Sequence, residues 1–172
     1  EPLTKDGGLA ECRNCAVDFF QKTNNGSISW IYFWDPDEQP HGNTEIGSAL
    51  RGLSELNDTY GFMFKYLNPT TTTDGQTSVP MSERISMFRT DPKGRLRFSG
   101  RIHETLDESI KKMMGMGVHP NIKQTEVVFV NMGLRRDPEK MRHKLSKYQG
   151  LLVEELESNP MSSASWLALG LQ

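Results

Sequence analysis

Hydrophobic and polar positions recur with two different periods along this chain, and each period predicts a type of element. Between Leu9 and Gln21 the apolar residues are three to four positions apart, which predicts an amphipathic helix. The stripe that we expect on its buried side consists of Cys12, Ala16, Phe19 and Phe20. The turn sequence Asn24-Asn25-Gly26 follows. Residues 27–34, SISWIYFW, are apolar, aromatic and β-branched, which predicts a buried strand.

Further along, the same patterns predict a mixed set of helices and strands. We expect helices over Asn43–Leu56, Leu106–Met114, Asp137–Ser158 and Ser163–Leu169, and strands over Tyr60–Leu67 and Ile122–Val130. The segment Asn68–Pro80 lacks periodicity and is expected to be a long loop. A hairpin is predicted from Glu83–Thr90 and Arg95–His103, and its second strand has one apolar and one basic face. Helices and strands mixed in this order predict an α/β fold.

Composition restricts the classes of function. The 172 residues carry a net charge of -2, which does not favour nucleic acid as a partner. No apolar run approaches the roughly 18 residues of a membrane span. The chain shows no signal peptide, and with two cysteines a disulfide framework is not expected, so we place the protein in the cytoplasm.

The two cysteines form a C-x-x-C spacing that suggests a redox centre or half of a zinc site. A second cysteine pair is lacking, and the four histidines are scattered. Cys12 and Cys15 also lie in the predicted amphipathic helix, where buried cysteine is common. We therefore expect structural cysteines in the core.

An acidic cluster follows the predicted strand 27–34. Asp35 and Asp37 flank a proline, and Glu38 comes next. Carboxylates at the carboxyl end of a strand face the crevice in which open α/β sheets bind ligands. Their hard oxygen atoms suit Mg²⁺ or Mn²⁺, which is usually shared with substrate phosphates. A solvated acidic turn is the alternative interpretation.

Two other polar groups are candidates for chemistry. Arg101, His103 and Glu104 stand together at the end of the predicted basic strand, where a cation, an imidazole and a carboxylate are close in sequence. Arg13 and Asn14 lie on the first predicted helix, outside its apolar stripe. By itself, a His-Glu pair is more often an ordinary surface pair, and Arg13-Asn14 is simply the polar side of an amphipathic helix.

Taken together, three segments resemble the GT-A nucleotide-sugar glycosyltransferases of family two. GLAECRNCAVDFF…ISWIYFWDPDE is similar to that family's A-R-N-x-A element followed by an apolar strand and D-x-D-E. MFRTDPKGRLRFSGRIHETLDESI resembles a later segment that ends in an H-E motif in a bacterial and phage-like branch. VVFVNMGLRRDPEKMRHKLSKYQGLLVEELESNP resembles that branch's closing segment, which often continues into helical repeats.

This resemblance implies an inverting, metal-dependent transfer of a sugar from a nucleotide-sugar donor to an acceptor hydroxyl. Asp35 and Asp37 match the metal-binding D-x-D, with Mn²⁺ or Mg²⁺ as the cofactor. Arg13 matches the arginine near the donor nucleotide, and Arg101 is a further candidate for donor binding. Glu104 matches the acidic residue of the H-E motif, which we interpret as the general base. His103 is expected to assist it and to touch the metal or the diphosphate.

Two departures from the family pattern shape the prediction. Asn131 stands where the closing segment usually has a histidine, and the nucleotide-binding N-terminal half of the family has no counterpart before Leu9. We therefore expect a partial GT-A, Rossmann-like mixed sheet with flanking helices, over residues 1–135, and a helical segment over residues 136–172. The acceptor, whether a glycan, a protein or a lipid-linked group, is left open, and the missing half or other chains of an assembly are expected partners. The alternative is a non-catalytic binding or assembly module derived from the same fold.

Overall fold

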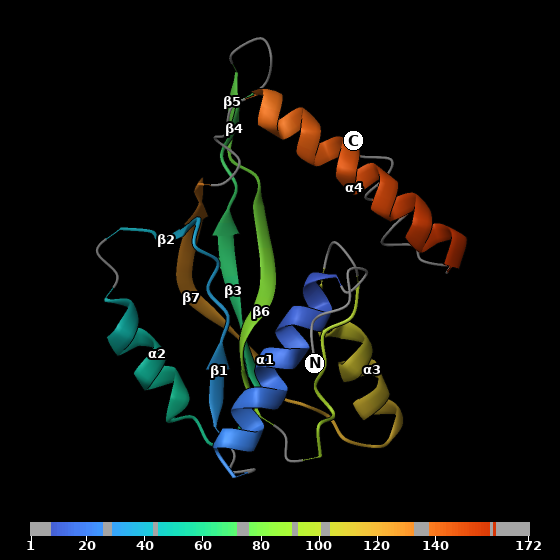
Figure 1. Cartoon of the computed structure of the whole chain (residues 1–172). Coiled ribbons are helices and arrows are strands. Elements are labelled where there is room, and N and C mark those ends of the chain that lie inside the picture. The colour runs from blue at the N-terminus through green and yellow to red at the C-terminus, as the bar shows by residue number, and fades with distance from the viewer. Residues whose placement is uncertain are drawn as a thin grey trace.

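The fold is α/β, with a mixed five-stranded sheet flanked by helices (Figure 1). The computed structural model describes residues 8–25, 29–42, 45–71, 76–90, 93–100, 104–132, 138–158 and 160. The strand order is β1-β6-β3-β7-β2, in which β3 and β7 are parallel and the other neighbours are antiparallel. The strands of this sheet are β1 (Trp30–Tyr32), β2 (Glu38–Pro40), β3 (Gly61–Leu67), β6 (Met81–Arg89) and β7 (Ile122–Asn131).

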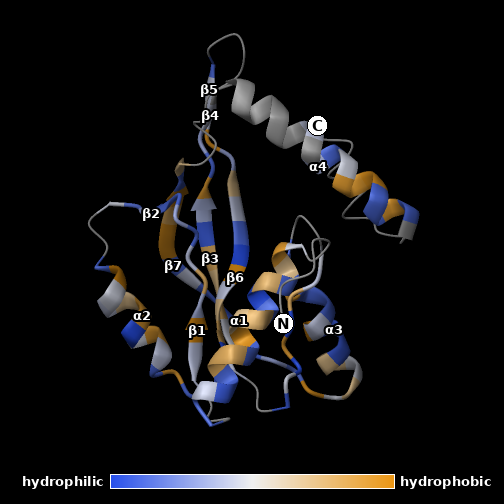
Figure 2. Cartoon of the chain, viewed as in Figure 1, coloured by the Kyte–Doolittle hydropathy of each residue, from blue (hydrophilic) through white to orange (hydrophobic). Residues whose placement is uncertain are grey.

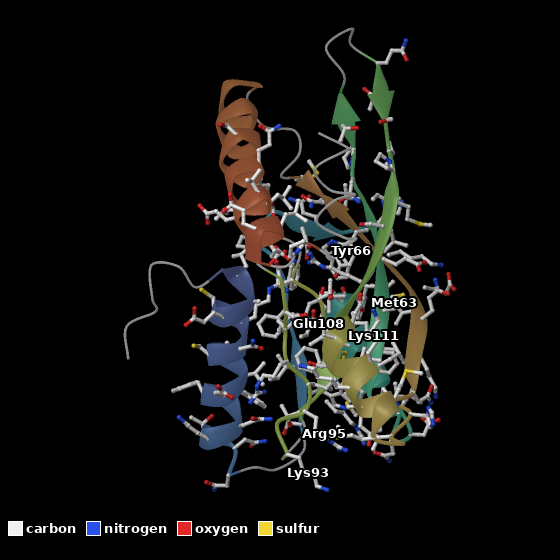
Figure 3. The ribbon with its side chains drawn as sticks, turned by 90° about the vertical axis from the view of Figure 1, so that its right-hand side faces the viewer. Met63, Tyr66, Lys93, Arg95, Glu108 and Lys111 are labelled. Atoms are coloured by element: carbon white, nitrogen blue, oxygen red, sulfur yellow. The ribbon has the colours of Figure 1, made fainter. Side chains whose placement is uncertain are left out.

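Helices lie on both faces of this sheet. They are α1 (Leu9–Thr23), α2 (Ile46–Ser54), α3 (Asp107–Gly115) and α4 (Pro138–Ser158). α2 packs on one face, whereas α1 and α3 pack on the other (Figure 1). α4 lies toward one end of the molecule, and Lys93 and Arg95 lie near the opposite end (Figure 3). None of the helices in the described ranges combines the length and the apolar character that crossing a bilayer requires.

Two hydrophobic clusters fill the space between the sheet and the helices. The cluster under α2 has Phe62, Phe64, Tyr66, Met87 and Phe129 at its centre. The cluster under α1 and α3 has Val17, Phe88, Leu96, Phe98, Leu106 and Met113 at its centre. Apolar segments of α2 and β7 are coloured orange in Figure 2. The sheet is therefore covered on both faces, as the predicted α/β fold requires.

The strand that precedes Asp35 contributes side chains to both hydrophobic clusters, although it is shorter and less buried than its sequence predicts. β1 is at the edge of the sheet and its three residues are half-buried. Trp30 and Tyr32 pack with the α2 cluster, whereas Ile31 and Phe33 pack with the α1–α3 cluster. This alternation, which follows from the two-residue period of a strand, fixes the position where the chain enters Asp35.

The helix α1 is confirmed, but the prediction of its buried face is wrong. Val17 is 1% exposed, whereas Phe19 is 70% exposed and both Cys12 and Cys15 are exposed. The side that faces the protein carries Arg13, whose side chain is only 13% exposed. Polar contacts with neighbouring segments, described below, orient the helix so that its more apolar stripe faces outward.

The predicted hairpin of residues 83–90 and 95–103 is also wrong. Next to the turn, residues Met87–Arg89 of β6 pair with β1 on one edge, and Met87 and Phe88 pair with β3 on the other. The part of β6 at which the hairpin would begin is therefore already paired on both edges. Residues 95–100 run as an irregular segment with a single bridge between Ser99 and Thr105. Leu96 and Phe98 are nevertheless buried, as their alternation predicts. The expected basic face is partly neutralised, because Arg97 pairs with Asp18 at 2.6 Å.

The predicted loop 68–80 contains a short hairpin. Its strands β4 (Thr70–Thr71) and β5 (Thr77–Ser78) are antiparallel, and the hydroxyls of Thr70 and Ser78 are 2.8 Å apart. The main-chain N–H of Asn68 donates to the carbonyl of Pro80 at 2.8 Å, so this hairpin extends the β3–β6 pair. The predicted cap at Asn43 and the predicted helix Ser163–Leu169 lie outside the described residues.

α3 ends where the sequence predicts, in a specific cap. The N–H of Val118 donates to the carbonyl of Met113, and the N–H of Gly117 donates to that of Met114. This pair of hydrogen bonds is a Schellman motif. Gly117 has φ +75°, which a residue with a Cβ atom adopts only at a cost. The cap directly follows Gly115, the last residue of α3.

Candidate functional site

Three segments that are far apart in the sequence meet at the guanidinium group of Arg13. Its Nη2 atom lies 3.0 Å from Oδ1 of Asp35 and 2.7 Å from Oε1 of Glu104. The side chain of Glu104 is 10% exposed and that of Asp35 is 37% exposed. Arg13 therefore connects the acidic turn at residues 35–38 with Glu104.

The chain holds Arg13 in place with aromatic rings and with the residue that follows it. The guanidinium carbon lies 5.2 Å from the ring centre of Phe33 and 5.4 Å from that of Phe98. Asn14 bonds the main chain of Phe98 twice, accepting from its N–H at 2.8 Å and donating to its carbonyl at 2.9 Å. Asn14 thus fixes α1 to the irregular segment that leads toward Glu104.

A second arginine, Arg84 of β6, binds the other side of the acidic turn. Its Nη2 atom is 3.2 Å from Oδ2 of Asp35 and also pairs with the carboxylate of Glu38. Its guanidinium carbon lies 4.3 Å from the ring centre of Tyr66, and its Nε donates to the hydroxyl of Ser86 at 3.1 Å. Asp35 is therefore held between two guanidinium groups.

Sequence reasoning missed Arg84. The signal available was weak, because Arg84 lies within a strand whose neighbouring residues, SERISMF, are half polar and half apolar. Arg84 and Ser86 occupy alternate positions of β6, so they share a side of the strand. A partly buried charge of this kind needs a partner of opposite sign, and the structure supplies it from the acidic turn.

Glu38 is the most buried carboxylate of the turn. Its side chain is 0% exposed, and it accepts a hydrogen bond from the main-chain N–H of Asp35 at 3.2 Å. Burial raises the pKa of Glu38 to about 6, and the positive charge of Arg84 opposes this rise. Burial also raises the pKa of Tyr32, with smaller contributions from Tyr66 and Glu38. The buried side of the turn thus disfavours additional negative charge.

Asp37 is placed differently from Asp35. It is half-buried, and its main-chain carbonyl accepts from the N–H of Met132 at 2.7 Å. In the antiparallel pairing of β2 with β7, Glu38 is opposite Asn131 at the end of β7. The pairing of β2 with β7 therefore brings the D-x-D-E turn next to the V-N-M-G segment.

The donor types fit the expected metal only in part. Asp35 and Asp37 supply the carboxylate oxygens that Mg²⁺ and Mn²⁺ prefer, but both oxygens of Asp35 already face arginine. Within the described ranges, no group of three or more histidine, cysteine or acidic side chains is arranged to hold a metal ion. Arg101 and His103, which we predicted for the donor and the metal, lie outside those ranges.

A pocket of about 220 Å³ opens beside the ion pairs. Arg13, Arg84 and Glu104 line it, together with two further carboxylates, Glu83 and Asp107. The apolar part of its lining consists of Met63, Ile85, Phe98 and Leu106. Met63 of β3 is on the side of the molecule shown in Figure 3, where Glu108 and Lys111 of α3 are also labelled. Glu104 is thus accessible from a pocket that has both polar and apolar walls.

No family model and no curated protein matches this chain. The interpretation of the site therefore rests on the contacts described above and on the resemblance of three short segments.

Proposed function

We propose that this chain is the C-terminal half of a GT-A glycosyltransferase that transfers a sugar from a nucleotide-sugar donor to an acceptor hydroxyl. The observation that carries this proposal is the contact of Arg13 with both Asp35 and Glu104. Arg13 and Asp35 come from the two ends of the first segment of the resemblance and Glu104 comes from the second, and an active site requires such segments to meet. Chance similarity of two separate segments gives no reason for them to converge on one side chain.

The acidic turn is the proposed binding site for the donor diphosphate and its metal. Asp35 and Asp37 would hold Mn²⁺ or Mg²⁺, which supplies neutralisation of the negative charge on the departing diphosphate. Both oxygens of Asp35 also contact arginine, so a metal at this turn would share Asp35 with Arg13 and Arg84 and would take Asp37 as the second carboxylate of the proposed pair. His103 and Arg101 are proposed to contact the same diphosphate, as the resemblance implies.

Glu104 is the proposed general base. As the acceptor oxygen bonds to the anomeric carbon and the bond from that carbon to the diphosphate breaks, Glu104 takes the proton of the acceptor hydroxyl. The adjoining pocket gives a hydroxyl access to this carboxylate. Arg13 is a positioning residue, because its contact at 2.7 Å fixes the carboxylate of Glu104 relative to Asp35.

One observation favours the alternative of a non-catalytic module. Two arginines of the chain itself pair with Asp35 and Glu38 of the acidic turn, so these two carboxylates are compensated without any metal. A binding or assembly module derived from a transferase would keep such ion pairs as part of its structure. Such a module should bind its partner without a divalent cation and should show no sugar transfer, whether or not Glu104 is changed.

Substitution of Glu104 tests the proposed base. The native protein that contains this chain should be assayed with Mn²⁺ and a panel of nucleotide sugars, by release of nucleoside diphosphate. Glu104→Gln keeps size and hydrogen bonding but removes basicity, so turnover should fall by roughly a hundredfold or more. The matched control is Glu108→Gln, at an exposed acidic residue of α3 labelled in Figure 3.

Binding and folding measurements separate the possible outcomes. Diphosphate affinity and the urea midpoint of Glu104→Gln should stay close to those of Glu108→Gln. Equal turnover in both variants would exclude Glu104 as the base. Loss of the folded state in Glu104→Gln would instead assign this carboxylate a structural role as the partner of Arg13.

A further inference from the structure

Two exposed thiols lie one turn apart on α1. Cys12 and Cys15 are both free and both exposed, which contradicts the expectation that they belong to the core. α1 lies at the outer edge of the molecule in Figure 3. Exposed cysteines are open to oxidation and thiol exchange, whereas buried structural cysteines are inert. The reason to dismiss the C-x-x-C spacing as structural therefore no longer holds.

The two residues between these cysteines reach into the candidate site. Arg13 binds Asp35 and Glu104, and Asn14 makes both hydrogen bonds with the main chain of Phe98. A single helical turn thus carries the thiols outward and the positioning side chains inward. Any change in the shape of this turn is transmitted directly to Arg13 and Asn14.

Helix geometry allows a disulfide across this turn only with local distortion. In an ideal α-helix, residues three apart have Cα atoms about 5 Å apart, which is within the range for a disulfide. Their Cβ atoms are about 5–6 Å apart, whereas a disulfide requires about 3.5–4.5 Å. The turn from Cys12 to Cys15 must therefore tighten when the bond forms, and the residues between must move.

We propose that Cys12 and Cys15 form a reversible disulfide that displaces Arg13 and Asn14 from their contacts. The oxidant is a small-molecule disulfide such as oxidised glutathione. One cysteine thiolate attacks it, forms a mixed disulfide and releases one glutathione thiol. The second cysteine thiolate then attacks the protein sulfur of the mixed disulfide and releases the other. Two electrons and two protons pass from the cysteines to glutathione.

The consequence is a thiol-disulfide site that controls the geometry of the ion pairs. In the reduced form Arg13 holds Glu104 and Asp35 together, and in the oxidised form this link is weakened. The strain of the tightened turn makes the disulfide easier to reduce than an unstrained one. The inference uses only the described contacts of α1, so it does not depend on glycosyl transfer.

Mass spectrometry of the glutathione-treated chain tests whether Cys12 and Cys15 form the disulfide. The chain is incubated in mixtures of oxidised and reduced glutathione, alkylated and measured intact under non-reducing conditions. We expect a monomer that has lost two hydrogens and takes up no alkylating reagent. Cys12→Ser and Cys15→Ser should each stop at a glutathione adduct. Persistent glutathione adducts or disulfide-linked dimers of the unsubstituted chain would overturn the proposal.

Hydrogen exchange at the main-chain amide of Phe98 tests whether the disulfide disturbs the contacts of Asn14. Its N–H donates to Asn14 Oδ1, so the disulfide form should exchange this amide about tenfold faster than the reduced form. Cys15→Ser treated with the same oxidant should show no change. The amide of Phe64, in the buried part of β3, should remain slow in both forms. Unchanged exchange at Phe98, or equal acceleration at Phe64, would contradict a local link between the thiols and the site.

Discussion

Replacing Glu38 by glutamine should change how the stability of this protein depends on pH. The carboxyl group is fully buried and its pKa in the folded state is raised from 4.5 to about 6. Burial is the largest cause, and the nearby Arg84 offsets only part of it. Glutamine has nearly the same shape but does not titrate, so the variant isolates the effect of this proton.

The direction of the pKa shift of Glu38 determines how the stability changes with pH. Because folding raises the pKa, the folded state binds this proton more tightly than the unfolded state does. The stabilisation from Glu38 is fully present below about pH 4.5 and is lost as pH rises through about 6. The difference between these two pKa values corresponds to about 2 kcal/mol in the free energy of unfolding.

Urea unfolding of both proteins across this pH range measures the effect. The unfolding free energy of Glu38→Gln minus that of the unsubstituted protein should increase by about 2 kcal/mol between about pH 4 and pH 7. At about pH 4 both side chains are neutral, so the difference there measures the exchange of a carboxylic acid for an amide, and its change with pH reports the loss of the proton from Glu38. Glu126→Gln, at a side chain that is 95% exposed, is the control for removing one acidic group. A difference that stays flat or falls with rising pH would refute the reasoning.

Two further predictions concern stability. Arg13→Met should destabilise the protein by about 3 kcal/mol, because it leaves the 10%-exposed Glu104 without its positive partner. The same change at the more exposed Arg97 should cost less than about 1 kcal/mol, and equal costs in urea unfolding would contradict this ranking. Gly117→Ala should lower the unfolding free energy by about 1–2 kcal/mol because of its positive φ. Gly115→Ala, which meets open space at the end of α3, should be neutral or stabilising, and a larger loss there than at Gly117 would contradict the cap.

Local periodicity was sufficient to locate most elements of the fold. The helices α1, α3 and α4 and the strands β3 and β7 lie within two residues of their predicted bounds. Each of them has a sustained apolar pattern with turn residues at its ends. The stripe Ile46, Leu50 and Leu53 of α2 packs against the sheet as its spacing predicts. These features depend on near neighbours, which the sequence displays directly.

The predictions failed for contacts between segments that are distant in the sequence. β6 is followed by a turn-like sequence that favours a hairpin, yet both of its edges are occupied by β1 and β3. Likewise, the hydrophobic stripe of α1 faces outward because Arg13 and Asn14 find partners in segments 35, 98 and 104. Contacts between distant residues decide both outcomes, and they leave no periodic signal in the sequence.

The candidate site was predicted in part. Arg13, Asp35 and Glu104 were selected from the sequence, and the structure brings them together. Arg84 was missed because a single arginine within a strand has no distinguishing pattern. The metal set remains a prediction, since the described residues contain no group of three or more histidine, cysteine or acidic side chains arranged to hold a metal, and His103 lies outside them.

Isothermal titration calorimetry tests the proposed transferase most directly. A nucleoside diphosphate is titrated into the native protein that contains this chain, with and without Mn²⁺. The account predicts binding that strengthens with Mn²⁺, because phosphate oxygens complete the coordination of the metal. Asp37→Asn should abolish the Mn²⁺ dependence, whereas Asp58→Asn, at an acidic residue paired with Lys123 on the surface, should retain it. Diphosphate affinity that is unaffected by Mn²⁺, or equal in the two variants, would contradict a metal-dependent glycosyltransferase site at the acidic turn.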